Sequence, residues 1–213
     1  MEGLSAGSAE LEAFDEYRKT LSSDRQVLLG KYELVDIARK VVGIGSAGTM
    51  CGVALLTSQR DDVLILQIKE ARASVLEPYA GQSKYLHHGE RIVNGQRLMQ
   101  AASDIFLGWT TGRREPFRHF YMRQLRDVKI GVNTAFWSKE DFRNFPKIAG
   151  RILAKAHSRS VDSSALRGYL GKSEQFDEAI GGYAVAYAKQ TEQDYRRFVR
   201  ACKLGELKAE LLD

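Results

Sequence analysis

Three glycines and a serine stand at positions suited to the binding of phosphate groups. Gly43, Gly45, Ser46 and Gly48 lie in the stretch VVGIGSAGTMCGVALL, and the glycines have the spacing G-x-G-x-x-G. Glycine lets the backbone turn tightly and bring its N–H groups close to phosphate oxygens. The same spacing occurs in dinucleotide-binding turns, in flaps that cover nucleotide phosphates, and in plain hairpins. The residues that follow must distinguish these three possibilities.

A dinucleotide-binding turn requires a helix that starts at the glycines and an acidic residue about 20 positions further on. Asp61 and Asp62 stand near that distance. However, the segment after Gly48, TMCGVALL, contains another glycine and no helix cap, and the two aspartates precede the next apolar run instead of ending it. The dinucleotide interpretation is therefore weakened.

A phosphate-covering flap of the protein-kinase type requires two strands around the glycines and a third strand that carries a lysine in an apolar run. Lys69, in LQIKEA, lies 26 positions after Gly43 and meets this requirement. Strand alternation places Gln67 and Lys69 on one face. We therefore expect the Lys69 ammonium to reach the α- and β-phosphates of ATP beneath the flap.

The third requirement is a glutamate on the following helix, because a carboxylate orients the phosphate-binding lysine. Glu90, in HHGERIVNGQRLMQ, lies 21 positions after Lys69 and near the start of a helix expected from about residue 88 to residue 103. Glycine segment, lysine and glutamate thus occur in the order that a nucleotide site needs. The predicted ligands are ATP and, with it, Mg²⁺.

The elements that must position these residues form an α+β pattern. Residues 1–40 read as an N-terminal helical segment, with a break near Ser22 and then a run that is helical or extended. Residues 41–130 read as a small lobe with the glycine segment, the lysine strand, one helix and two more strands. Residues 131–213 read as helical. We therefore expect a protein-kinase-like fold, with a mostly antiparallel five-stranded sheet that one helix interrupts and a helical region follows.

Composition narrows the class of partner. The 213 residues carry a formal net charge of +5, with 44% hydrophobic and 28% charged residues and only 3 prolines, which is typical of a folded domain with an anionic partner. The aromatic residues Trp109, Phe120 and Tyr121 alternate as strand residues without a basic groove, which favours a place in the sheet core over a base-stacking platform, so nucleic-acid binding would rest on charge alone.

The sequence also bears on location and metal binding. The chain has no apolar run long enough for a membrane span and an acidic N-terminal stretch in place of a signal peptide, so we expect a cytoplasmic location without membrane contact. Its 2 cysteines and 4 histidines show no metal-ligand spacing.

Longer runs of the sequence resemble a known family. ARKVVGIGSAGT, LQIKEARASVLEPY, HHGERIVNGQRLMQAASDIFLGWTT, FYMRQLRD, LAKAHSRSVD and YAVAYAKQTEQDY closely resemble the C-terminal half of the bacterial family called domain of unknown function 2252, which is regarded as protein-kinase-like. The resemblance covers nearly all of the chain from about Phe14 onward. It implies a kinase-like small lobe with ATP bound at the glycine segment.

The resemblance also implies where the catalytic acids lie. In longer relatives, a G-D-x-H-x-x-N element and a D-F-D element precede the glycine segment, in a circularly permuted order. Here, SRSVDSSALRGYLG follows His157 with neither an H-x-D-x-x-x-x-N nor a D-F-G element, and Asp162 reads as a structural residue at a helix end.

We therefore expect a fragment or short form of a phosphotransferase that is inactive alone. A separate or upstream catalytic segment would supply the missing acids and most Mg²⁺ ligands. The alternative is a non-catalytic, kinase-like module for protein interaction or regulation.

Overall fold

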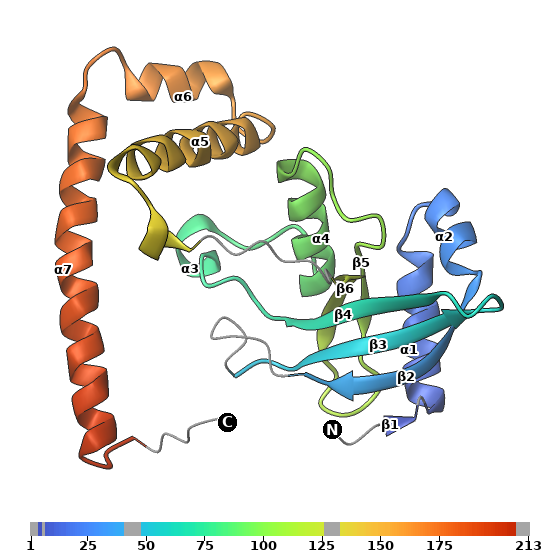
Figure 1. Ribbon diagram of the computed structural model, residues 1–213. Coiled ribbons are helices and arrows are strands. Elements are labelled where there is room, and N and C mark those ends of the chain that lie inside the picture. The colour runs from blue at the N-terminus through green and yellow to red at the C-terminus, as the bar shows by residue number, and fades with distance from the viewer. Residues whose placement is uncertain (1–3, 6, 41–47, 126–132, 208–213) are drawn as a thin grey trace. The chain divides into compact units, whose positions relative to one another are not determined.

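The computed structural model describes residues 4–5, 7–40, 48–125 and 133–207 (Figure 1). It divides into two compact units, residues 1–160 and residues 161–213, which are described separately. The predicted residues Gly43, Gly45 and Ser46 lie outside the described residues.

The first unit is built on an antiparallel sheet in the order β1-β2-β3-β4-β6-β5 (Figure 1). Its strands are β1 (Leu4–Ser5), β2 (Tyr32–Arg39), β3 (Cys51–Ser58), β4 (Val63–Ala71), β5 (Gly108–Thr111) and β6 (His119–Gln124). The predicted five-stranded antiparallel sheet is confirmed as β2 to β6, and the two-residue strand β1 extends it at the β2 edge.

Helices precede, interrupt and follow this sheet. They are α1 (Ser8–Lys19), α2 (Ser23–Leu29), α3 (Glu77–Ala80), α4 (His88–Met99) and α5 (Lys139–His157), with the 3-10 helix η2 (Thr134–Phe136) before α5. The predicted inserted helix is α4, which lies between β4 and β5 in the chain. The α+β class is therefore confirmed.

The core lies between α1 and one face of the sheet. Strand alternation brings the even-numbered residues of β3 and β4 onto this face, where Leu56 and Leu66 are fully buried. Tyr17 of α1 is also fully buried, and its hydroxyl donates a 2.6 Å hydrogen bond to the carbonyl oxygen of Phe106. The buried cluster consists of Phe14, Tyr17, Leu21, Leu29, Ala54, Leu56, Leu64, Leu66, Phe106 and Met122.

The first long strand begins earlier than the sequence indicates. Residues 1–40 were expected to be helical, with an extended run as an alternative near the end, and β2 occupies Tyr32–Arg39 of this segment. Its pairing with β3 shifts between Leu34 and Asp36, so the period of two breaks within the strand. Because of this irregularity, the apolar pattern of the segment matches neither a regular strand nor a regular helix.

Helix α4 approaches the sheet very closely at its first turn. A Cβ atom at Gly89 would overlap the backbone carbonyl oxygen of Phe120 in β6, so only glycine fits there. One turn later Val93 is fully buried, and near the end of the helix the Arg97 guanidinium lies 5.9 Å from the centre of the Trp109 ring. The path of α4 is therefore fixed along its length.

The second unit consists of α6 (Ser163–Leu170) and α7 (Gln175–Lys203). Asp162 caps α6, because its Oδ1 accepts hydrogen bonds from the N–H groups of Ser164 and Ala165. Asp162 therefore has the structural role that the sequence indicates. Helix α7 is 29 residues long and carries several exposed aromatic residues.

Candidate functional site

The glycine segment joins two neighbouring antiparallel strands. Its base is closed by a 3.0 Å hydrogen bond from the Lys40 N–H to the Cys51 carbonyl oxygen, at the ends of β2 and β3. Gly48, the one motif glycine among the described residues, has a φ of +72°, which favours glycine. A strand, not a helix, follows the glycines, so the geometry of a dinucleotide-binding turn is absent. The strands on either side of the segment are therefore paired as the two arms of a β-hairpin.

Lys69 lies next to the end of this segment. In the sheet register Lys69 pairs with Cys51, the first residue of β3, and on its other side with Tyr121 of β6. The neighbouring even-numbered residues Leu66 and Ile68 face the core, so Lys69 projects from the opposite face. Among the described side chains, none forms a hydrogen bond or ion pair with the Lys69 ammonium.

Glu70, the next residue, holds the backbone of Met50, which lies between the glycine segment and β3. Its carboxylate accepts a 2.7 Å hydrogen bond from the Met50 N–H, and its own N–H donates to the Met50 carbonyl oxygen at 2.8 Å. Arg72 and Arg118 donate to the same carboxylate at 2.8 and 3.1 Å. Arg72 also donates to the Gly48 carbonyl oxygen. We call this group, formed by Gly48, Met50, Glu70, Arg72 and Arg118, the Glu70 anchor.

The charge state of Glu70 follows from these contacts. Its side chain is only 7% exposed, and burial by itself raises the pKa of a carboxyl group. The hydrogen bonds from Arg72 and Met50, together with the charges of Arg72 and Arg118, outweigh burial and hold the Glu70 pKa below its ordinary value. Glu70 is therefore a carboxylate at neutral pH.

Glu90 lies in the first turn of α4, as predicted. Its N–H donates to the His87 Nδ1 at 3.1 Å, and its carbonyl oxygen accepts from the Asn94 side chain at 3.0 Å. The Glu90 carboxylate forms no ion pair with Lys69 in this structure, and no other described residue pairs with it. The structure thus brings Lys69 to the loop but does not join Lys69 to Glu90.

Three histidines fix the first turn of α4. His87 caps the helix, and the His119 Nδ1 of β6 accepts a 3.0 Å hydrogen bond from the His88 N–H. The rings of His87 and His119 stack with their centres 3.9 Å apart, and the centre of the His88 ring lies 5.1 Å from that of His119. We call His87, His88 and His119 the histidine cluster. Both Nδ1 atoms serve as acceptors, so the arrangement needs them unprotonated.

The surroundings favour this neutral state. Burial lowers the pKa of His87, and the nearby His119 and His88 lower it further, although Glu16 and a backbone hydrogen bond to Thr110 oppose the shift. Burial likewise lowers the pKa of His119, together with the charge of His88 and against that of Glu16. The position of Glu90 therefore depends on unprotonated histidines.

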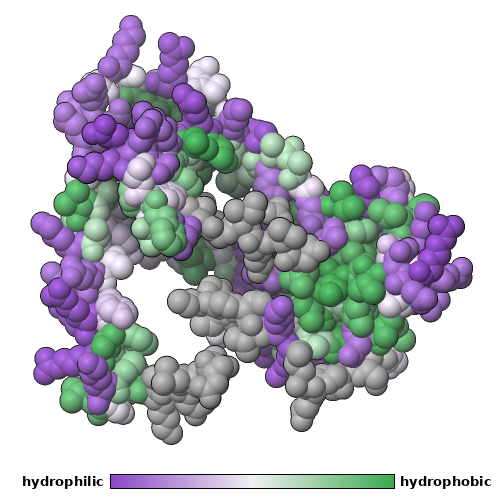
Figure 2. All heavy atoms as spheres, viewed as in Figure 1, coloured by the Kyte–Doolittle hydropathy of each residue, from purple (hydrophilic) through white to green (hydrophobic). Residues whose placement is uncertain are grey.

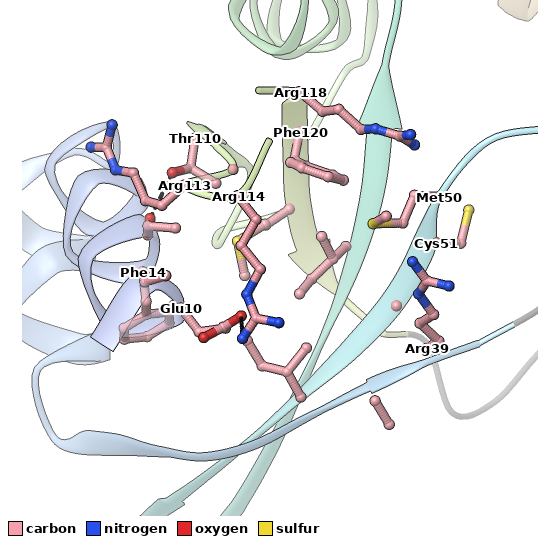
Figure 3. Close-up of a pocket in the computed structure, with 18 of the residues that line it drawn as sticks. Glu10, Phe14, Arg39, Met50, Cys51, Thr110, Arg113, Arg114, Arg118 and Phe120 are labelled. Atoms are coloured by element: carbon pink, nitrogen blue, oxygen red, sulfur yellow. Dashed lines mark hydrogen bonds and ion pairs between the residues drawn. The ribbon is translucent and has the colours of Figure 1, made fainter. Parts of the chain in front are cut away.

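A cavity of about 450 Å³ opens on the same face of the sheet as the core, opposite Lys69 and between α1 and the strands (Figure 3). Phe14 of α1, Ile37 of β2 and Ile68 of β4 contribute to its apolar lining. Because Ile68 and Lys69 face opposite sides of the same strand, this cavity lies away from Lys69. Its lining also includes Met50, next to the glycine segment, so the cavity reaches that end of the sheet from the face opposite Lys69.

Four arginines also line the cavity, and three of them are neutralised. The ion pairs are Arg113 with Glu16 at 2.7 Å, Arg114 with Glu10 at 2.8 Å, and Arg118 with Glu70 at 3.1 Å. Figure 3 shows Arg39 and Arg114 extending toward this space from β2 and from the turn between β5 and β6. Through Arg118, the cavity borders the Glu70 anchor.

Within the described residues, no group of three or more His, Cys, Asp or Glu side chains could hold a metal ion. Over the same ranges, no helix combines the length and the apolar character that crossing a bilayer requires.

The sequence predictions omitted the Glu70 anchor and the histidine cluster. A charged residue on each side of Ala71, in KEAR, was the available signal for the anchor, but it does not reveal which backbone groups the charges meet. His119 lies 31 positions from His88, and only the pairing of β6 with its neighbours and the close approach of α4 bring them together.

Comparison with known proteins gives one match. The model of a family described as "Uncharacterized protein conserved in bacteria (DUF2252)" matches residues 6–201. Neither the curated proteins nor the solved structures contain a match to this chain.

Proposed function

The chain belongs to this DUF2252 family, and we propose that it is a nucleotide-binding domain of the protein-kinase type with ATP as its ligand. The observation that carries the proposal is the register of the sheet. Lys69 stands directly beside Cys51, where the glycine hairpin ends, and its ammonium is free of partners among the described residues. A lysine at this place can meet phosphates that lie beneath the hairpin loop.

The roles of the site residues follow from this placement. Backbone N–H groups between Gly43 and Gly48 would cover the phosphates, and Lys69 would bind the α- and β-phosphates as a point charge. Glu90 would orient Lys69, which requires the first turn of α4 to bring its carboxylate to the ammonium. Because the two side chains are not paired in this structure, we expect weak binding of ATP by the isolated chain.

Phosphate transfer requires more than these residues. The described residues hold no cluster of acids for Mg²⁺, so we derive no transfer step in this chain. A separate or upstream catalytic segment would supply the Mg²⁺ ligands and the acid that positions the acceptor hydroxyl. The proposed activity is thus nucleotide binding by this chain and phosphate transfer only together with such a segment.

A thermal-shift titration with ATP and Mg²⁺ tests the proposal. At ten times the dissociation constant, mass action adds about 1.4 kcal/mol to the free energy of unfolding, which raises the Tm of a domain of this size by about 3–6 °C. We expect this rise for the wild type and for Lys31→Met, whose lysine lies exposed between α2 and β2. Lys69→Met should show little or no rise.

The alternative function is a non-catalytic module that binds another protein. The observation in its favour is the number of exposed aromatic and aliphatic side chains on α5 and α7. A Tm that does not change at millimolar ATP would favour this alternative, whereas an equal rise for wild type and Lys69→Met would mean that ATP binds away from Lys69.

A further inference from the structure

Helix α7 carries an apolar stripe along most of its 29 residues. The exposed fractions of its six large members range from 43% for Phe176 to 66% for Tyr195. We call this set the α7 stripe, and it consists of Phe176, Ile180, Tyr183, Tyr187, Thr191, Tyr195, Phe198 and Cys202. Figure 2 shows hydrophobic residues at the surface of α7 between hydrophilic ones. An apolar stripe on an otherwise polar helix is the pattern of a packing surface.

The composition of α7 indicates that packing is needed. Gly181 and Gly182 lie inside the helix, with no atom near their would-be Cβ positions. Each glycine costs a helix about 1 kcal/mol relative to alanine. Because helix propensity is unfavourable here, contacts of the apolar stripe must contribute to the stability of this segment.

The α7 stripe has the same spacing when it is followed from either end. Its members are separated by 4, 3, 4, 4, 4, 3 and 4 residues. In an antiparallel pair of identical helices, Phe176 would therefore meet Cys202 of the other copy, Ile180 would meet Phe198, and Tyr183 would meet Tyr195. Phe176, Tyr187 and Phe198 are 11 residues apart, which is three turns at about 3.67 residues per turn. The stripe therefore stays nearly parallel to the helix axis.

The ends of α7 carry opposite charges. Glu174, Asp177 and Glu178 lie at its start, whereas Arg197, Arg200 and Lys203 lie in its last two turns. Antiparallel pairing places each acidic end beside a basic end, and parallel pairing would place like charges together. At the centre of the stripe, the Thr191 hydroxyl donates to the Tyr187 carbonyl oxygen at 2.9 Å, so this hydroxyl keeps its hydrogen bond in an apolar contact.

We propose that the α7 stripe binds the α7 stripe of a second copy of this chain, in an antiparallel and two-fold symmetric pair. The symmetric spacing allows every member to find a partner in the same stripe, and the charge distribution selects the antiparallel direction. The proposal is independent of the nucleotide site.

Light scattering across a dilution series tests the pairing. Wild type should have twice the 23.9 kDa mass of the chain, with a fall toward that mass on dilution. Ile180→Asp places a carboxylate in the stripe and should make the chain monomeric. Val185→Asp is the matched control, because Val185 is 61% exposed on the same helix but lies about 200° around it from Tyr183. Circular dichroism checks that both variants keep their helices.

Disulfide formation tests the direction. Phe176→Cys should form an interchain disulfide with Cys202 of the second copy under mild oxidation. Wild type should form none, because antiparallel pairing keeps the two Cys202 residues about 39 Å apart, and Cys51 is buried. A monomeric wild type, an equal loss of pairing in both aspartate variants, or a disulfide in the wild type but not in Phe176→Cys would overturn the proposal.

Discussion

At the scale of single residues, adjacent side chains on β4 have separate tasks. Lys69 projects from the sheet face opposite the core, beside Cys51 at the start of β3, whereas Glu70 turns to the other face and holds the Met50 N–H. The two positions differ because a strand alternates its side chains between faces. Any role of Lys69 at the loop therefore depends on how well Glu70 fixes the backbone of Gly48 and Met50.

Glu70→Gln should destabilise the chain by about 1–3 kcal/mol, because a largely buried carboxylate that accepts from two arginines and a backbone N–H is replaced by a neutral amide. Urea denaturation at neutral pH measures this loss. Glu33→Gln is the control, since Glu33 is exposed on β2 and forms no ion pair with a described residue. Equal stability of both variants and wild type would contradict the role of the Glu70 anchor.

The same comparison has a pH dependence of known sign. Because the folded state lowers the Glu70 pKa, the contribution of its charge is complete above pH 4.5, the ordinary value, and declines as the pH falls through the lowered value. The difference between wild type and Glu70→Gln should therefore shrink below pH 4.5.

At the scale of elements, α4 is placed by its backbone as much as by its side chains. Gly89→Ala should destabilise the chain by about 1–3 kcal/mol, because a methyl group would overlap the Phe120 carbonyl oxygen and force α4 away from β6. Gly95→Ala, in the same helix but with open space around it, should stabilise by about 0.5–1 kcal/mol. Denaturant unfolding of both variants measures the opposite signs, and two changes of the same sign would contradict the packing.

The first turn of α4 should also respond to pH. The folded state lowers the pKa values of His87 and His119, so it takes up protons less readily than the unfolded chain. Stability should therefore be complete above pH 6.5, the ordinary value for histidine, and should fall as the pH is lowered through the depressed values. Urea denaturation at several pH values follows this loss.

His119→Asn separates this effect from general acid sensitivity. The asparagine offers a side-chain acceptor near the Nδ1 position but does not titrate, so the variant should lose less stability than wild type between pH 7.5 and 5.5. His157→Asn, at the exposed end of α5, is the control and should behave like wild type. An unchanged pH dependence of His119→Asn would contradict the role of the histidine cluster.

At the scale of the whole molecule, the strands and the helix with a clear local pattern of apolar residues could be predicted from the sequence. The apolar, β-rich runs CGVALLTS and VLILQIKEA were predicted as strands, and they pair as β3 and β4. The inserted helix with Glu90 in its first turn was also predictable, because its apolar residues recur at helical period. These features depend on local pattern alone.

Features that depend on contacts between distant segments were not predictable. The bulge in β2 hides the strand period between Leu34 and Asp36. The Glu70 anchor requires the register of β3 against β4, and the histidine cluster requires the approach of α4 at Gly89. Neither is encoded in a short window of sequence, because each joins residues that only the folded sheet brings together.

Covalent labelling with an acyl phosphate of ATP tests the central claim, that nucleotide phosphates lie beside Lys69, most directly. An amine close to the phosphates attacks the acyl carbonyl carbon and releases the nucleotide, so the acyl group stays on that lysine and mass spectrometry locates it. We expect Lys69 to be the main labelled residue and excess ATP to suppress its labelling, while exposed lysines such as Lys31 show weak labelling that ATP does not change. Labelling spread over exposed lysines, with Lys69 unlabelled or indifferent to ATP, would contradict the claim.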